Sequence, residues 1–93
     1  MRKTKVVHCL KESFDVSISR PGIWGNPFVI GKDGTREQVI QKYKEWVVQQ
    51  EWLMKMLPTL EGKRLGCYCK PAACHGDVLV ELLDGIITNE LIS

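Results

Sequence analysis

The sequence predicts a small α/β domain, with a mixed or parallel sheet and flanking helices. Apolar and polar residues alternate at period two near the N-terminus, as half-buried strands require. Apolar residues then recur at helical spacing in the middle and near the end of the chain. The length of 93 residues, with 44% hydrophobic and 26% charged residues, suits one compact domain spanning residues 1–93.

Two strands are expected near the N-terminus. Residues 5–10 form a short apolar run, and residues 14–19 alternate apolar and polar side chains. In the second run the side chains of Phe14, Val16 and Ile18 share one face, so we expect them to point into the core.

A helix is expected to begin after Thr35. Thr35 is a typical N-cap residue, and Gln38 three positions later completes a capping box. The helical spacing of apolar residues continues to residue 57, either as one helix or with a second short helix after a polar break. Trp46 and Trp52 fall on apolar positions of this pattern, and we expect both in the core.

A third strand and a last helix complete the domain. Residues 63–69 predict a strand parallel to an earlier one, with the helical segment 35–57 as the crossover between them. A Rossmann-like strand–loop–helix unit follows, in which residues 78–83 are helical and Gly85 ends the helix. Residues 86–93 form an apolar tail that either packs on the domain or pairs with a second chain.

Chemistry-bearing residues gather between that strand and that helix. Cys67, Cys69 and Cys74 fall within eight residues, and His75 and Asp77 follow at the start of the helix. Strand alternation places the first two cysteines on one face, whereas the free N–H groups of a helix start favour an anion or a thiolate. Ligands of open α/β sheets collect at the carboxyl ends of strands, so these side chains are expected in one site.

Three interpretations of this cluster stay open. In the first, zinc is bound by Cys67, Cys69, Cys74 and His75, or the three cysteines hold an iron–sulfur cluster. In the second, Cys74 is a catalytic nucleophile with a lowered pKa, and His75 or Asp77 transfers the proton. In the third, the cysteines pack as small apolar residues, and the side chains of His75 and Asp77 only cap the helix.

The irregular segment 20–28 carries the second signal. Two prolines and two glycines exclude a regular helix or strand there. Arg20 offers a planar donor fork for phosphate or carboxylate, Trp24 a face for stacking, and Asn26 an amide for hydrogen bonding. The alternative is a rigid loop in which Trp24 fills the core and Arg20 makes a surface ion pair.

These motifs occur together in a pattern that resembles a known family. Its most specific parts are Trp-Gly-Asn-Pro at residues 24–27 and Cys-His-Gly-Asp at residues 74–77, and the pattern extends to Leu83. The chain resembles the domain-of-unknown-function family 4326, common in phages and bacteria. Its cysteine-rich segment is also similar to a second uncharacterised family, number 488. The first resemblance implies a compact α/β fold and a site joining segment 20–26 to segment 67–77, and its phage setting allows a role in host takeover or anti-defence.

Charge and hydropathy indicate which classes of function the sequence does not favour. A net charge of +2 and an isoelectric point of 8.4 give little support to nucleic-acid binding. No apolar run approaches the roughly 20 residues that span a membrane. No signal-peptide pattern is present, so the four cysteines are expected as free thiols in the reducing cytoplasm.

We therefore expect a cytoplasmic protein that binds a nucleotide-like or other phosphorylated small molecule between the two segments. The alternative is a small zinc-stabilised adaptor that binds a host protein. Whether the protein is an enzyme, and which oligomer it forms, stay open. The expected ligand-binding residues are Arg20, Trp24, Asn26, Cys67, Cys69 and Gly76, and the expected catalytic residues are Cys74, His75 and Asp77.

Overall fold

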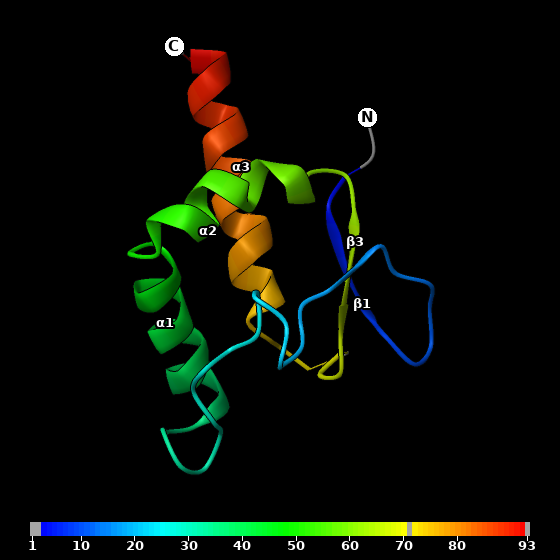
Figure 1. The fold of residues 1–93 in the computed structure, drawn as a ribbon, viewed down its shortest axis with the longest axis vertical. Coiled ribbons are helices and arrows are strands. Elements are labelled where there is room, and N and C mark those ends of the chain that lie inside the picture. The colour runs from blue at the N-terminus through cyan, green and yellow to red at the C-terminus, as the bar shows by residue number, and fades with distance from the viewer. Residues whose placement is uncertain (1–2, 71, 93) are drawn as a thin grey trace.

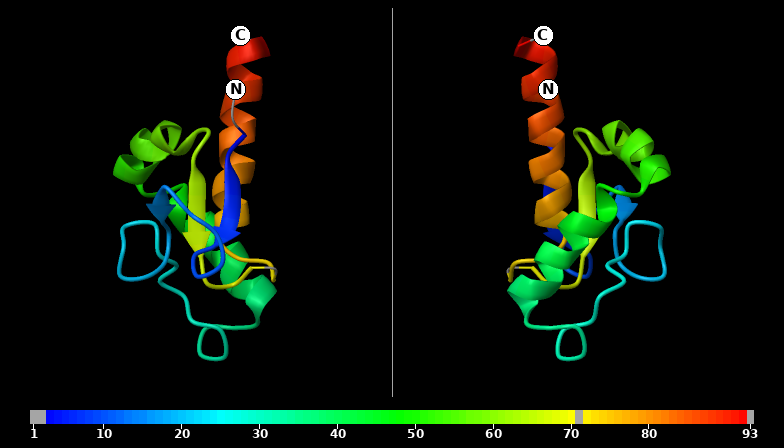
Figure 2. Two further views of the ribbon diagram at one scale, coloured as in Figure 1. Left: turned by 90° about the vertical axis from the view of Figure 1, so that its right-hand side faces the viewer. Right: turned by 90° about the vertical axis from the view of Figure 1, so that its left-hand side faces the viewer.

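A three-stranded parallel sheet forms the centre of the domain. The computed structural model describes residues 3–70 and 72–92, with side chains described up to residue 85. The strands are β1 (Lys5–His8), β2 (Val16–Ser17) and β3 (Arg64–Cys67), in the order β1-β3-β2. Figure 2 shows them side by side in this order. The fold is therefore the small α/β domain that the sequence predicts.

The last strand in the sequence, β3, lies in the middle of the sheet. It pairs in parallel with β1, Val6 opposite Leu65, and with β2, Val16 opposite the same Leu65. The pairing continues past β2, where the N–H of Ile18 donates to the carbonyl of Gly66 at 3.0 Å. The prediction of a late strand parallel to an earlier one is confirmed, and the late strand is parallel to both.

The helices lie beside the sheet. They are α1 (Arg36–Val47), α2 (Glu51–Met56) and α3 (Gly76–Ile92), and the 3₁₀ turn η1 (Leu57–Leu60) follows α2 directly. Figure 1 shows α1 and α2 on one side of α3 and the sheet on the other. Since α3 packs against β1, α1 and η1, it joins the sheet to the other helices.

The helical segment begins as expected and then divides. The Thr35 hydroxyl accepts from the N–H of Gln38 at 3.3 Å, and the Gln38 side chain accepts from the N–H of Thr35 at 2.8 Å, so the capping box is confirmed. The backbone at Gln50 (φ −88°, ψ 89°) leaves the helical region and separates α1 from α2. This break shifts the helical phase, so Leu53 is buried while Trp52 is 53% exposed. The prediction of Trp52 in the core is wrong.

Two other expectations are corrected. Phe14 is 41% exposed: it lies before β2, and although one side of its ring covers Gly66 of β3, the ring does not enter the core. Gly85 does not end the last helix, since α3 continues to Ile92. The pairing or packing of the apolar tail concerns side chains outside those that the structure describes.

Tyr43 lies at the centre of the core and connects three parts of the chain. Its hydroxyl donates to the carbonyl oxygen of Trp24 at 2.9 Å, and its ring meets that of His75 edge-on at 4.9 Å. Tyr43 of α1 therefore holds both the irregular loop and the start of α3. The buried apolar core comprises Val6, Val7, Ile18, Trp24, Val39, Tyr43, Val47, Leu53, Leu57, Leu60, Leu65, Cys67, Cys74, Val78, Leu79 and Leu83.

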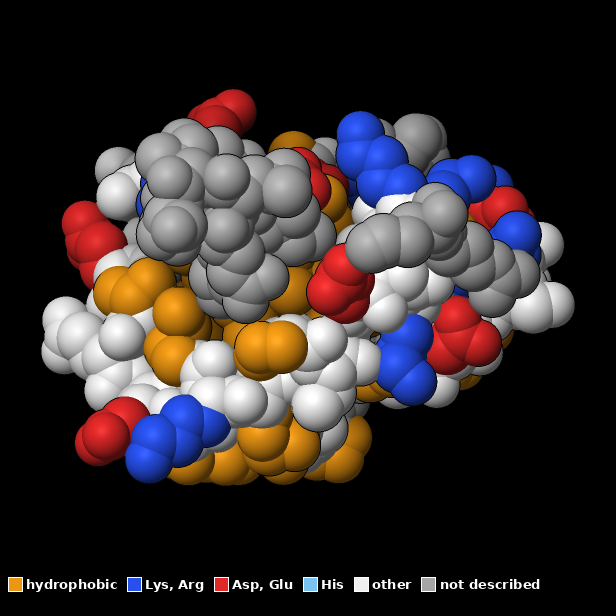
Figure 3. All heavy atoms as spheres, turned by 90° about the horizontal axis from the view of Figure 1, so that it is seen from above, with side chains coloured by type: hydrophobic (Ala, Val, Ile, Leu, Met, Phe, Trp, Pro, Cys, Tyr) orange, Lys and Arg blue, Asp and Glu red, His pale blue; other side chains and the backbone are white. Residues whose placement is uncertain are grey.

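The described surface carries mixed charge. Figure 3 views the molecule from the end where the C-terminus lies, and on this face basic and acidic side chains are interspersed. Proteins that bind nucleic acids usually gather their basic residues in one patch or stripe, which this face does not show. None of the helices in the described part of the chain is long and apolar enough to cross a membrane.

Replacing Tyr43 with Phe should lower the free energy of unfolding by about 1–3 kcal/mol, because the buried carbonyl of Trp24 loses its hydroxyl donor. Chemical denaturation monitored by circular dichroism measures the change. Tyr68→Phe is the matched control, since that tyrosine is 61% exposed and its hydroxyl is free to bond to water. Equal stability of the two variants would contradict the role of Tyr43.

Candidate functional site

A cleft of about 370 Å³ lies where the irregular loop meets the junction between β3 and α3. Its size falls in the range of roughly 300–1,000 Å³ found for small-molecule sites. It joins the two segments that the sequence singles out, together with the N-terminal part of α1. The lining residues are Ser19, Arg20, Asn26, Phe28, Val29, Ile30, Arg36, Val39, Ile40, Cys67, Tyr68, Cys69, Ala73, Cys74 and His75.

Two arginines give the cleft its charge. Arg20 and Arg36 are its charged lining residues, and no aspartate or glutamate is among the described residues that line it. The stem of Arg20 lies against Gly25, where an added Cβ would come within 2.8 Å of the Arg20 Cγ. Arg36 donates from Nη1 to the carbonyl of Ala73 at 3.0 Å, which ties the start of α1 to the loop before α3.

Arg36 also lines the cleft, although the sequence does not single it out. It is the first residue of α1, where the helix dipole disfavours a positive charge. A basic residue in the first helical turn is thus a departure from the usual charge pattern. That departure was the available signal, and the structure shows that the Arg36 side chain makes its contact outside its own helix, at the carbonyl of Ala73.

The remaining wall is largely apolar. Phe28, Ile30 and Tyr68 face the cleft together with aliphatic residues of α1. Apolar walls with a small number of polar groups are typical of sites that bind small molecules. The cleft therefore combines a cationic part with a surface suited to a flat or apolar group.

Asn26 lines the cleft, but its amide already has partners. Its Nδ2 donates to the carbonyl of Val39 at 3.3 Å, and its Oδ1 accepts from the N–H of Phe28 at 2.9 Å. These bonds fasten the loop to α1. Asn26 thus shapes the wall that a ligand would meet.

Two other expected ligand-binding residues lie away from the cleft. Trp24 is 3% exposed and belongs to the core, which agrees with the alternative in which it fills the core, and Tyr43 holds its carbonyl there. Gly76 is buried at the start of α3, where an added Cβ would come within 2.6 Å of the Ile18 Cδ1. Its small size therefore allows α3 to approach the sheet closely.

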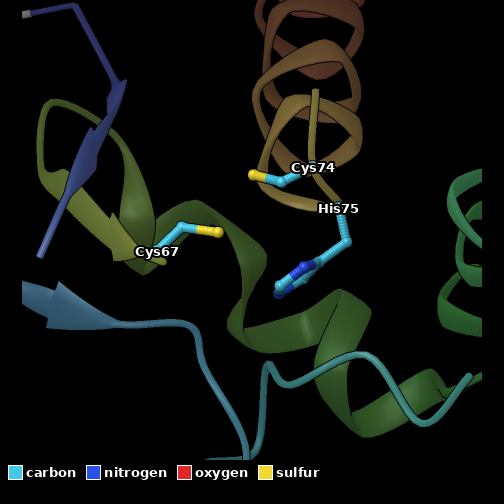
Figure 4. Close-up of side chains that lie close together, drawn as sticks. All are labelled: Cys67, Cys74 and His75. Atoms are coloured by element: carbon cyan, nitrogen blue, oxygen red, sulfur yellow. The ribbon is translucent and has the colours of Figure 1, made fainter. Parts of the chain in front are cut away.

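Cys67, Cys74 and His75 form a buried cluster at one side of the cleft. Their potential ligand atoms, two sulfurs and a ring nitrogen, all lie within 4.8 Å of one another. Figure 4 shows the two sulfur atoms turned toward each other, with the imidazole beside them. The sulfur of Cys69 lies beside Cys67 and interacts with it, but it is not among the three ligand atoms that are all close to one another. The structure thus brings together three of the four expected metal ligands.

The start of α3 is capped by its own side chains. The Cys74 sulfur accepts from the N–H of Gly76 at 3.3 Å, and the Asp77 carboxylate accepts from the N–H of Cys74 at 3.1 Å. Asp77 also pairs with Lys70 at 3.0 Å. Asp77, expected to transfer a proton, is therefore engaged in the helix cap and does not line the cleft.

The two buried cysteines affect each other's ionisation in opposite directions. A hydrogen bond from the Cys67 thiol lowers the pKa of Cys74, and the N–H of Gly76 lowers it further. The same bond and burial raise the pKa of Cys67. The pair therefore favours a thiolate on Cys74 beside a protonated Cys67.

His75 is held as a neutral imidazole. Burial lowers its pKa, the largest of the effects that act on it. Its Nε2 lies 2.7 Å from the carbonyl oxygen of Ile18, and a carbonyl oxygen accepts only a protonated nitrogen. Nε2 therefore carries the hydrogen, and Nδ1 keeps a lone pair available to a proton or a metal ion.

Comparison with known proteins finds viral relatives. Residues 1–85 match the family model described as Domain of unknown function (DUF4326). The chain is 37% identical over 94 residues to the "Uncharacterized 12.4 kDa protein in nrdA-td intergenic region" of Enterobacteria phage T4, covering 96% of this chain and 85% of that protein. It is 36% identical over 67 residues to "Uncharacterized protein R718" of Acanthamoeba polyphaga mimivirus, covering 63% of this chain and 51% of that protein.

No solved structure matches the chain significantly. The similarity of the cysteine-rich segment to family 488 stays a prediction, whereas the resemblance to family 4326 is confirmed.

In metal-free protein, one thiolate should form at lower pH than an ordinary cysteine thiol, because the pKa of Cys74 is lowered. The ultraviolet absorbance of thiolate during a pH titration measures this step. Cys67→Ala removes the thiol donor and should move the step to higher pH, while Cys9→Ala, outside the cluster, should leave it unchanged. A low-pH step that persists in Cys74→Ser would show that another cysteine is responsible.

Proposed function

The chain belongs to the DUF4326 family, and we propose that it binds a small phosphorylated, nucleotide-like molecule in the cleft. One observation carries this proposal: two guanidinium groups line the cleft, and no described lining residue is acidic. The compared relatives come from a phage and a giant virus, so we propose that this binding serves a virus in its host cell.

The two arginines suit the anionic end of such a ligand. A guanidinium has five N–H donors in a planar fork that matches two phosphate oxygens. Arg36 uses one bond for Ala73 and keeps donors for a ligand. Arg20, exposed and anchored along its stem on Gly25, is free to close on the ligand from the other segment.

The apolar wall suits the flat part of the ligand. The Phe28 ring supplies the stacking surface that the sequence assigns to Trp24, and Tyr68 offers a second ring at the rim. Aromatic rings stack on nucleobases with an energy of about 1–3 kcal/mol per base. This wall favours a nucleotide-like ligand over inorganic phosphate, which would use the arginines alone.

The zinc-stabilised adaptor has less support. Structural zinc sites are four-coordinate and closed by four protein ligands. Among the described residues, three potential ligand atoms come together, and their residues line an open cleft. We therefore propose a ligand-binding cleft in preference to a closed structural zinc site.

Thermal-shift measurements with inorganic phosphate, pyrophosphate and a panel of nucleoside mono-, di- and triphosphates test the proposal. At 100 times Kd, a ligand stabilises the folded state by about 2.7 kcal/mol, which raises Tm clearly. We expect the nucleotides to raise Tm more than phosphate or pyrophosphate. No shift with any compound would exclude the proposed ligand class.

Arg20→Ala should weaken nucleotide binding tenfold or more in isothermal titration, since a charge-assisted hydrogen bond contributes about 1.5–3 kcal/mol. Its unliganded Tm should change little, because the side chain is exposed. Lys55→Ala is the matched control: it removes one positive charge from the α2 surface, outside the cleft. Unchanged affinity in Arg20→Ala would overturn the site.

A further inference from the structure

The cluster of Cys67, Cys74 and His75 has the composition of a metal site. It brings two sulfurs and one ring nitrogen within 4.8 Å of one another, and all three residues are buried. Zinc bonds of about 2.3 Å to sulfur and 2.0 Å to nitrogen place tetrahedral ligand atoms roughly 3.5–3.8 Å apart. The ligand atoms, now up to 4.8 Å apart, would have to approach one another by about 1 Å to reach that geometry.

The imidazole is oriented as metal-bound histidines are. Metal-binding histidines usually donate their second ring nitrogen to a carboxylate or a backbone carbonyl, which fixes the tautomer and the ring plane. His75 makes this bond from Nε2 to the Ile18 carbonyl at 2.7 Å, and the Tyr43 ring packs against it at 4.9 Å. Nδ1 is left as the ligand nitrogen.

Both sulfurs receive a backbone N–H. The N–H of Cys69 lies 3.4 Å from the Cys67 sulfur, and the N–H of Gly76 lies 3.3 Å from the Cys74 sulfur. Bonds from backbone N–H groups stabilise negative charge on sulfur, so each sulfur has one supporting donor for the thiolate that a metal ion would bind. A buried pair of thiolates needs a cation to neutralise it.

We propose that Cys67, Cys74 and His75 bind one zinc ion, with its fourth coordination position open to the cleft. Thiolate and imidazole are the ligands that zinc favours. On binding, both thiols release their protons to solvent, and the dication balances the two thiolate charges. Three protein ligands with an open position are the arrangement of catalytic zinc sites, where water or a ligand atom completes the tetrahedron.

The open position faces the same space as the arginines. All three ligands line the cleft, as does Arg20. An oxygen of a bound anion, or a water molecule, would complete the zinc coordination there. The metal site goes beyond the proposed nucleotide binding and stands without it, because its ligands and their supporting bonds do not involve either arginine.

Titration of the metal-free full chain with cobalt(II) tests the proposal. We expect one cobalt per chain, with sulfur-to-cobalt charge-transfer absorption in the near ultraviolet, visible bands of a four-coordinate ion, and loss of both on adding zinc. Absence of stoichiometric binding in the wild-type protein overturns the proposal, whatever the variants do. Azide should alter the visible bands by entering the open position, and an unchanged spectrum overturns the open site.

Four variants separate the ligands. Cys74→Ser and His75→Ala should lose stoichiometric cobalt binding, and circular dichroism checks that each is folded. Cys69→Ala and Cys9→Ala should keep it. Loss of binding in Cys69→Ala overturns the three-ligand site, because Cys69 would then close it. Retained charge-transfer bands in folded Cys74→Ser overturn the assignment of that ligand.

The two proposals fail independently. Lys55→Ala, outside the cleft, should bind cobalt as the wild type does. Cobalt binding without any nucleotide binding would support the metal site and exclude the proposed function. Nucleotide binding in a chain that takes up no cobalt would support the proposed function and exclude the metal site.

Discussion

The cleft depends on one hydrogen bond that is shielded from water. The Tyr43 hydroxyl holds the carbonyl of Trp24, and the ring beneath it supports His75. A single side chain of α1 thereby sets the position of both the irregular loop and the start of α3. The bond lies in the core, where water cannot replace a lost donor, so the two walls keep a fixed separation.

Parallel pairing explains why residues distant in sequence border one cleft. β2 and β3 end at the same edge of the sheet, so Arg20, which follows β2, and Cys67, which ends β3, emerge near each other. One wall is cationic and the other carries sulfur. An anion would be repelled by thiolates without a metal ion, whereas a zinc ion would turn the sulfur wall into a second point of attraction.

Short sequence patterns correctly predicted three features. These are the capping box of α1, the parallel strand near the end of the chain, and the meeting of cysteine sulfur with the His75 imidazole. The sequence could not show what depends on distant packing. Trp52 is exposed because the backbone turns at Gln50; the polar break in the sequence allows a turn there but does not give its angle. The sequence left open whether Trp24 fills the core or lines a site, and the bond from Tyr43 of α1 decides for the core. Arg36 reaches the cleft because the segment at Ala73 lies beside α1.

The position of β3 has a consequence for how the chain acquires its structure during synthesis. β1 and β2 do not pair with each other, and both need a partner that begins at Arg64. Until that segment leaves the ribosome, the first two thirds of the chain have no sheet to join. The nascent protein must hold its early strands unpaired and then insert the last one between them. Assembly of the sheet is thereby a late event that starts when the cysteine-bearing segment appears.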